Sequence, residues 1–387
     1  MNRRRAATAA ALLALLLPLP LAAAGTSAAA EAPSAAESRR TALELPRPTG
    51  RFPVGQETLH LVDRSRTDPW AGSGPRELMV TMRYPAQRGT GGPVRYLTRE
   101  EARLLLVDKQ LDGVIPVEAL AGTAAHARSQ ARPVAGRYPL IVLSPGFTVH
   151  RSTLTALAED LASRGYVVAA VDHAYESVGT AFPGGRVLEC LACEKAEAGT
   201  PMRAVSDNRA RDVSFLLDRL TGRHPAWRHA GLIDTSRIAM AGHSIGGASA
   251  LAAMAADPRV RAGINMDGGL ATPAPETGIG ARPFMLIGAQ DGVPGGNASW
   301  DRDWPRLDGW KRWITFADSG HFTFSDFPAL ADQLGLPDPE APLGGARSVE
   351  LTRAYVAAFF DQHLKGRPQP LLDGPSPEAP EVRFHTP

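Results

Sequence analysis

The sequence predicts an α/β protein with a mostly parallel central sheet of about eight strands and helices on both faces. Short apolar runs, for example 140–143, 238–241 and 284–287, alternate with longer helical stretches. These runs are apolar throughout, which is typical of parallel strands buried on both faces. The helical stretches end at glycine or at Asp-Pro, which are common stop signals. We therefore expect a doubly wound sheet.

Eight strands are expected near residues 58–62, 78–84, 140–143, 166–171, 238–241, 260–266, 284–287 and 313–316. The first two predict an antiparallel entry to the sheet. Four helices are expected at 153–164, 202–220, 245–256 and 348–365. One insertion, at about 89–135, interrupts this plan. It contains Thr98-Arg99-Glu100-Glu101, a capping-box pattern that predicts a short helix in a lid or wall of the site.

Two further stretches are candidate walls for a substrate. One runs from 271 to 280, and the other holds Trp300, Trp304, Trp310 and Trp313. Tryptophan is large and highly buried on average, so a core role for these side chains is the main alternative.

The N-terminus resembles a secretory leader. Three arginines at 3–5 precede an apolar run at about 9–24 and then small residues, with cleavage expected after Ala24 or Ala30. The run is shorter than the ~20 residues that a spanning helix needs. We therefore expect a secreted protein without a transmembrane segment.

The leader sets the expected domain organisation. Residues 1–30 are assigned to the signal peptide and 31–49 to a disordered linker, which is poor in large apolar side chains. A single catalytic domain is expected over 50–387.

The charge balance argues against nucleic acid as a partner. The chain has 42 basic and 40 acidic residues, a formal net charge of +2. A small-molecule or lipid substrate is the expected partner, with transient contact to a lipid or polymer surface. The oligomeric state is not predicted, and no cofactor or metal is expected.

The two cysteines, Cys190 and Cys193, form a C-x-x-C pair. Export favours a local disulfide between them. A redox motif is the alternative, but the strand and helix that such a motif requires are not evident around them.

A nucleophile is predicted at Ser244. The segment Gly242-His243-Ser244-Ile245-Gly246 follows an apolar strand and precedes a helix of small residues. A serine on such a sharp turn adopts a strained conformation, and glycines two residues away on each side avoid clashes. This pattern predicts catalysis by a serine hydroxyl, with an inert helix-packing turn as the alternative.

A serine hydroxyl needs a histidine base that is oriented by a carboxylate. In a nucleophile-elbow fold the chain order is serine, acid, histidine. Three histidines follow Ser244. His363 falls in the last helix and His385 almost at the C-terminus, so His321, after the strand 313–316, is the expected base. Asp267 and Asp291 both end strands at suitable places, and the residues leave both open as the acid.

The order and spacing of these residues resemble the secreted, plasma-type platelet-activating factor acetylhydrolases and their bacterial relatives, over about 50–365. The resemblance implies an α/β-hydrolase fold and favours Asp267, 23 residues after Ser244, as the acid. Bacterial lipases and cutinases resemble the chain next most closely, and their pattern matches Asp291.

Two backbone N–H groups are expected to bind the oxyanion of the tetrahedral intermediate. One belongs to Ile245, directly after the serine. The other belongs to Phe147, in a loop that resembles the His-Gly-containing loop of this fold. Here Pro145 stands in place of the usual histidine, and Gly146 still permits a close backbone approach.

The sequence thus predicts a secreted serine ester hydrolase that acts through an acyl-serine intermediate. The family resemblance implies short-acyl or phospholipid-type esters. A cutinase-like polyester hydrolase or lipase that uses Asp291 is one alternative. A non-catalytic binding protein of the hydrolase fold is the second.

Overall fold

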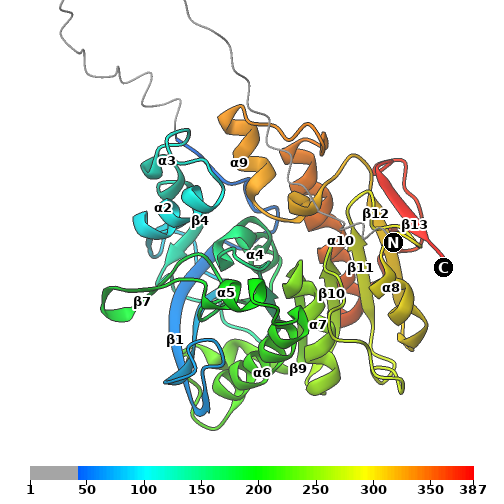
Figure 1. The fold of residues 1–387 in the computed structure, drawn as a ribbon, viewed down its shortest axis with the longest axis horizontal. Coiled ribbons are helices and arrows are strands. Elements are labelled where there is room, and N and C mark those ends of the chain that lie inside the picture. The colour runs from blue at the N-terminus through cyan, green and yellow to red at the C-terminus, as the bar shows by residue number, and fades with distance from the viewer. Residues whose placement is uncertain (1–41) are drawn as a thin grey trace, which may run out of the picture. The chain divides into compact units, whose positions relative to one another are not determined.

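The computed structural model describes residues 42–387, which build an α/β sheet of eleven strands covered by helices (Figure 1). The expected leader lies outside the described residues. The strands are β1 (Val54–Thr67), β2 (Pro75–Pro85), β3 (Gly92–Arg95), β4 (Ala124–Ser129), β5 (Tyr138–Ser144), β6 (Val167–His173), β9 (Ile233–His243), β10 (Val260–Met266), β11 (Phe284–Gly288), β12 (Lys311–Phe316) and β13 (Val382–His385). A separate hairpin joins β7 (Thr180–Phe182) to β8 (Arg186–Leu188).

The strand order is β13-β12-β11-β10-β9-β5-β6-β2-β1-β4-β3. The pairs from β6 through β5, β9, β10 and β11 to β12 are all parallel. β1 and β2 pair antiparallel, which confirms the predicted entry. The carboxyl ends of the parallel strands therefore share one edge of the sheet, where ligands bind in open α/β folds.

The prediction of about eight strands was too low. All eight expected strands form, and β3, β4 and β13 extend the sheet at its two ends. These three are short, and at most one residue of each is buried, so they lack the continuous apolar runs that revealed the others.

The helices of the described chain are α2 (Arg99–Asp108), α3 (Val117–Ala121), α4 (Thr155–Ser163), α5 (Leu191–Glu197), α6 (Met202–Thr221), α7 (Ile245–Ala256), α8 (Ala298–Asp303), α9 (Phe327–Leu334) and α10 (Gly345–Lys365). The prediction for 245–256 matches α7 at both ends. The stop signal at Gly366 is also confirmed, because this glycine ends α10 in the left-handed region.

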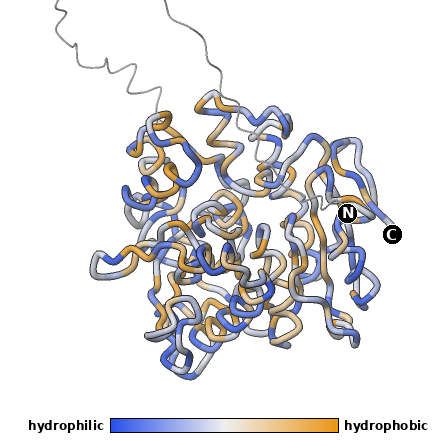
Figure 2. Tube along the Cα trace, in the orientation of Figure 1, coloured by the Kyte–Doolittle hydropathy of each residue, from blue (hydrophilic) through white to orange (hydrophobic). Residues whose placement is uncertain are grey.

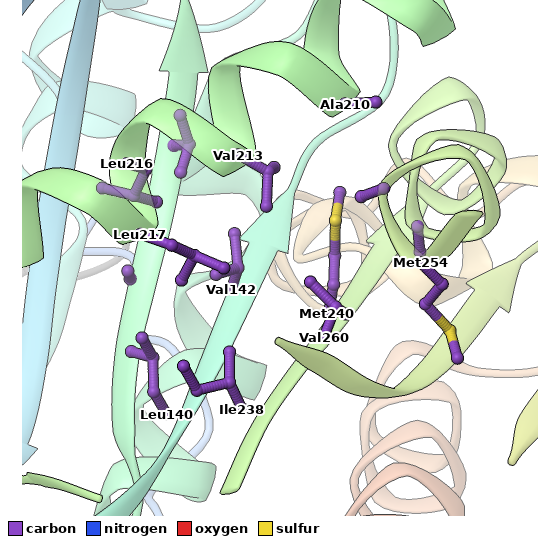
Figure 3. Close-up of a cluster of buried hydrophobic side chains, with 14 of the residues drawn as sticks. Leu140, Val142, Ala210, Val213, Leu216, Leu217, Ile238, Met240, Met254 and Val260 are labelled. Carbon is purple, nitrogen blue, oxygen red and sulfur yellow. The ribbon is translucent and has the colours of Figure 1, made fainter. Parts of the chain in front are cut away.

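Two hydrophobic layers lie on opposite faces of the sheet. Along β5, Leu140 and Val142 pack on one side with α6 and α7, and Figure 3 shows this layer with Val213 of α6. Ile141 and Leu143, at the alternate positions, pack on the other side with α4 and α10. Hydrophobic stretches recur along the inner strands, and hydrophilic ones gather at outer turns (Figure 2). Both faces of β5 are therefore buried, as its sequence predicts.

The insertion contributes β3 and β4 to the sheet and forms a small helical layer beside it. The capping box predicted at Thr98 and Glu101 is present at the start of α2. Apolar side chains of this layer pack against Leu330 of α9.

The residues at 42–49 correct the predicted linker. Leu43 and Leu45 are buried in the same cluster as α2, and Glu44 forms a β-bridge with Ala124. The linker prediction was therefore wrong for 42–49, because isolated leucines among prolines gave no periodic signal. Its part at 31–41 lies outside the described residues.

The tryptophan-rich stretch is mainly core. Trp300 and Trp313 are fully buried and make an edge-to-face contact with 5.3 Å between ring centroids. Among residues 42–387, no helix is long and apolar enough to cross a membrane.

Candidate active site

Ser244 lies at the turn between β9 and α7, at the carboxyl edge of the sheet. Its backbone has φ 55° and ψ −128°, a conformation that non-glycine residues rarely adopt. Space around the turn is minimal: a Cβ on Gly246 would lie 2.1 Å from the carbonyl oxygen of Ser144. A Cβ on Gly268 would lie 1.9 Å from the carbonyl oxygen of Ser244. Packing of main chain against main chain therefore holds the serine in this conformation.

His321 begins the short 3₁₀ helix η5 (His321–Phe324), which follows β12. Its Nε2 lies 3.0 Å from Ser244 Oγ, and its Nδ1 lies 2.6 Å from Asp267 Oδ2. The histidine side chain is 46% exposed and that of Asp267 is 14% exposed. The imidazole thus bridges the Ser244 hydroxyl and a largely shielded carboxylate.

Asp267 occupies a tight turn after β10, with φ 57°. Its N–H donates to the carbonyl oxygen of Ile287 at 2.8 Å, and its Oδ1 accepts the N–H of Ala289 at 2.9 Å. The Ala289 contact leaves Oδ2 as the oxygen that faces His321. Asp291 is exposed in the turn after β11, and within residues 42–387 no hydrogen bond joins it to His321.

Two buried side chains support this turn: Asn265, which was given no role from the sequence, and Trp300, which was expected only as a substrate wall or core residue. Asn265 donates from Nδ2 to the carbonyl oxygen of Gly268 at 2.6 Å and accepts the Gly268 N–H at 2.9 Å. The indole N–H of Trp300 donates to the same carbonyl at 2.6 Å. Asn265 could have been found from the sequence, because it stands two residues before the candidate acid and asparagine side chains often bond the backbone of such turns. The contact of Trp300 depends on tertiary packing.

His243, to which no sequence pattern gave a role, is also part of the site. It is buried, and its Nε2–H donates to the carbonyl oxygen of His321 at 2.7 Å. Burial, together with the neighbouring His321, lowers the pKa of His243 to about 4, so its ring is neutral at physiological pH. A Cβ on Gly146 would lie 3.0 Å from His243 Nδ1. His243 therefore links the serine turn, the base and the loop after β5.

The two candidate oxyanion donors lie next to the Ser244 turn. Ile245 is the first residue of α7, where helical N–H groups have no partner within the helix. Phe147 lies in the loop after β5, and its N–H donates to no acceptor among the described residues. Both groups are thus free to bind a ligand.

His150 ties the insertion to the catalytic edge. Its Nε2 lies 2.7 Å from Asp172 Oδ2, at the end of β6, and 2.9 Å from Glu101 Oε1 of α2. Burial lowers the pKa of His150, but the two carboxylates outweigh that effect and raise it to about 9. His150 therefore joins α2 to the sheet through these two carboxylates.

Neither a metal site nor a free thiol is present in the described part of the chain. No group of three or more His, Cys, Asp or Glu side chains there could hold a metal ion. Cys190 and Cys193 are joined by a disulfide at the start of α5.

Comparison with known proteins identifies the family. The profile of "Platelet-activating factor acetylhydrolase, isoform II" matches residues 40–184 and 219–335. The chain belongs to this family. A "Probable 1-alkyl-2-acetylglycerophosphocholine esterase" of Arthroderma benhamiae is 30% identical, over 91% of this chain and 96% of that protein. "Platelet-activating factor acetylhydrolase" of Gallus gallus is 25% identical, over 59% of this chain and 62% of that protein.

A solved structure extends the comparison to the fold. The ferulic acid esterase from Streptomyces cinnamoneus is 46% identical, with a TM-score of 0.80, and the match covers 89% of this chain and 99% of that one. The chain therefore has the α/β-hydrolase fold and is a serine hydrolase of carboxylic esters. The family and fold expected from the sequence are confirmed.

Proposed function

We propose that Ser244, His321 and Asp267 form the catalytic triad of this esterase. The observation that carries the proposal is the hydrogen-bonded chain from Asp267 Oδ2 through both nitrogens of His321 to Ser244 Oγ, at 2.6 and 3.0 Å. A neutral serine hydroxyl is a weak nucleophile, and an adjacent imidazole that accepts its proton activates it. The carboxylate holds the imidazole in the tautomer whose Nε2 accepts.

The reaction follows in two halves. Ser244 Oγ attacks the ester carbonyl carbon while His321 Nε2 takes the hydroxyl proton, and the alcohol leaves with that proton. Water then attacks the acyl-serine, with His321 again accepting and donating a proton. In both halves the N–H groups of Ile245 and Phe147 bind the oxyanion.

The preferred substrate is an ester with a short acyl group, such as the 2-acetyl ester of an ether phospholipid. This choice rests on the family and on the Arthroderma benhamiae relative, whose name specifies an acetyl ester. A second candidate is an ester of a hydroxycinnamic acid, because the solved ferulic acid esterase shares 46% of its residues with this chain.

A substrate panel separates these candidates. We expect kcat/KM to be highest for the acetyl phospholipid and for p-nitrophenyl acetate, and to fall as the acyl chain lengthens. Methyl ferulate as the best substrate would contradict the short-acyl proposal and support the second candidate. No turnover of any ester by the folded protein would favour the non-catalytic alternative.

We also propose that the protein is exported. The basic and apolar N-terminal segment is typical of a leader, and the Cys190–Cys193 disulfide suits an oxidising compartment. The N-terminal residue of protein recovered from culture medium tests this proposal, with Gly25 or Glu31 expected. Recovery in the cytosol alone would contradict it.

A further inference from the structure

A buried ion network lies behind the loop that carries Phe147. Its members Arg76, Glu176, Arg209 and Asp212 are each 0 or 1% exposed. Arg76 donates from Nη2 to Asp212 Oδ2 at 2.7 Å and to Glu176 Oε1 at 2.9 Å. Ions buried this completely are costly to desolvate unless they are paired. None of the four acts in the reaction proposed above, so their arrangement requires another explanation.

Arg209, on α6, connects this network to the first residues of the loop. Its Nη1 donates to the carbonyl oxygen of Pro145 at 2.5 Å and to Ser144 Oγ at 3.1 Å. Its Nε donates to Glu176 Oε2 at 2.7 Å. The Arg209 guanidinium thus bonds the loop, and its bond to the Glu176 carboxylate fixes the orientation of the guanidinium.

A neutral histidine adds a second contact to the same serine. His173 Nδ1 lies 2.8 Å from Asp212 Oδ2, and its Nε2 lies 3.1 Å from Ser144 Oγ. Burial, with the nearby charge of Arg209, lowers the pKa of His173. Because Nδ1–H donates to Asp212, Nε2 is free to accept a hydrogen bond from the Ser144 hydroxyl.

Glu176 holds the far end of the loop through its main chain. The carbonyl oxygen of Glu176 accepts the Thr148 N–H at 3.0 Å, and the Thr148 carbonyl accepts the Val178 N–H at 2.8 Å. Thr148 has φ 68°, which a β-branched residue rarely adopts. Such a conformation persists only where its surroundings enforce it. Phe147 therefore lies between two anchored points.

We propose that Arg209, oriented by Glu176, is a positioning residue for the oxyanion hole. It fixes the loop so that the Phe147 N–H points at the oxyanion. The proposal rests on the catalytic role assigned above to Phe147. An oxyanion donor must lie about 3 Å from the oxygen it stabilises. A shift of about 1 Å in an active site can cost about 10²-fold in rate.

The test compares Arg209→Lys with Arg353→Lys. Arg353 is a matched control, because it is also buried and donates to main-chain carbonyls, at Pro46, Arg47 and Ala156, none of them in this loop. The assays are p-nitrophenyl acetate hydrolysis and inhibition by benzyl trifluoromethyl ketone, which adds to serine to give an oxyanion.

We expect Arg209→Lys to lower kcat by about 10- to 100-fold and to weaken the ketone by a similar factor, with KM changed less than about 3-fold. Arg353→Lys should lower the melting temperature without this loss of kcat. Ser144→Ala removes one contact of Arg209 and the bond of the same hydroxyl to His173, and it leaves the Arg209 bond to Pro145 in place. It should show the same pattern at about 5-fold, and it provides the test if Arg209→Lys does not fold.

The positioning role would be overturned if Arg209→Lys and Ser144→Ala had the same kcat and the same affinity for the ketone as the wild type. A fall in kcat without weaker ketone binding would overturn it too. Failure of the wild type to hydrolyse p-nitrophenyl acetate or to bind the ketone would instead refute the proposed function itself.

Discussion

Replacing Asp267 by asparagine should disable the base without disturbing the turn. The Ala289 N–H donates to Asp267 Oδ1 at 2.9 Å, so the asparagine carbonyl oxygen is expected to remain on that N–H. Its NH2 group then faces His321 Nδ1, where the carboxylate oxygen lay at 2.6 Å. An NH2 donor there requires Nδ1 to accept, which places the imidazole proton on Nε2. Nε2 can then no longer take the proton of Ser244.

The expected loss follows from this change of tautomer. The same substitution in a serine protease triad lowers kcat by about 10⁴-fold, equivalent to about 5.5 kcal/mol of transition-state stabilisation. We expect a loss of this order for Asp267→Asn with p-nitrophenyl acetate. We expect a change below about 3-fold for Asp291→Asn, because Asp291 is exposed and His321 is hydrogen-bonded to Asp267 instead. A large loss in Asp291→Asn together with near-normal Asp267→Asn would refute the assignment of the acid.

Three further predictions concern the surroundings of the site. Gly246→Ala should destabilise the fold by about 2 kcal/mol and lower kcat, because the added Cβ would lie 2.1 Å from the Ser144 carbonyl oxygen. Thermal melting and kinetics test this prediction, and a melting temperature and kcat equal to those of the wild type would contradict it. His243→Phe should lower kcat about 10-fold, since the hydrogen bond to the His321 carbonyl is lost, and an unchanged kcat would show that this bond does not position the base. The pKa of His150 is about 9 in the folded state and about 6.5 in the unfolded state. The resulting contribution to the free energy of unfolding, about 3 kcal/mol, is therefore complete below about pH 6.5 and is lost as the pH rises through about 9. Urea unfolding at pH about 6 and about 9.5 should therefore show a smaller difference for His150→Gln than for the wild type, and equal differences would contradict this linkage.

Local patterns in the sequence predicted the core of the fold and the residues that meet at its edge. The apolar runs of β5 and β9 to β12 are buried on both faces, so composition alone revealed them. Three histidines follow Ser244, and the positions of His363 in the last helix and His385 near the C-terminus left His321 as the expected base.

Other features depend on contacts that no local pattern encodes. Asp267 and Asp291 both follow buried strands, and only the backbone path, with φ 57° at Asp267, determines which carboxylate faces His321. The Trp300 indole reaches the Asp267 turn across 32 residues of sequence. β13 was missed because a short half-exposed strand acquires its structure from pairing with β12. Long-range partners of this kind become visible only in three dimensions.

Ser244 is expected to carry the acyl group during turnover. Rapid mixing of the wild-type protein with p-nitrophenyl acetate, quenched in acid and followed by peptide mass spectrometry, measures this directly. We expect one acetyl group on the peptide that contains Ser244, and neither acetylation nor hydrolysis in a folded Ser244→Ala variant. Undiminished hydrolysis by Ser244→Ala, or acetyl transfer to another side chain with the same kinetics, would contradict it.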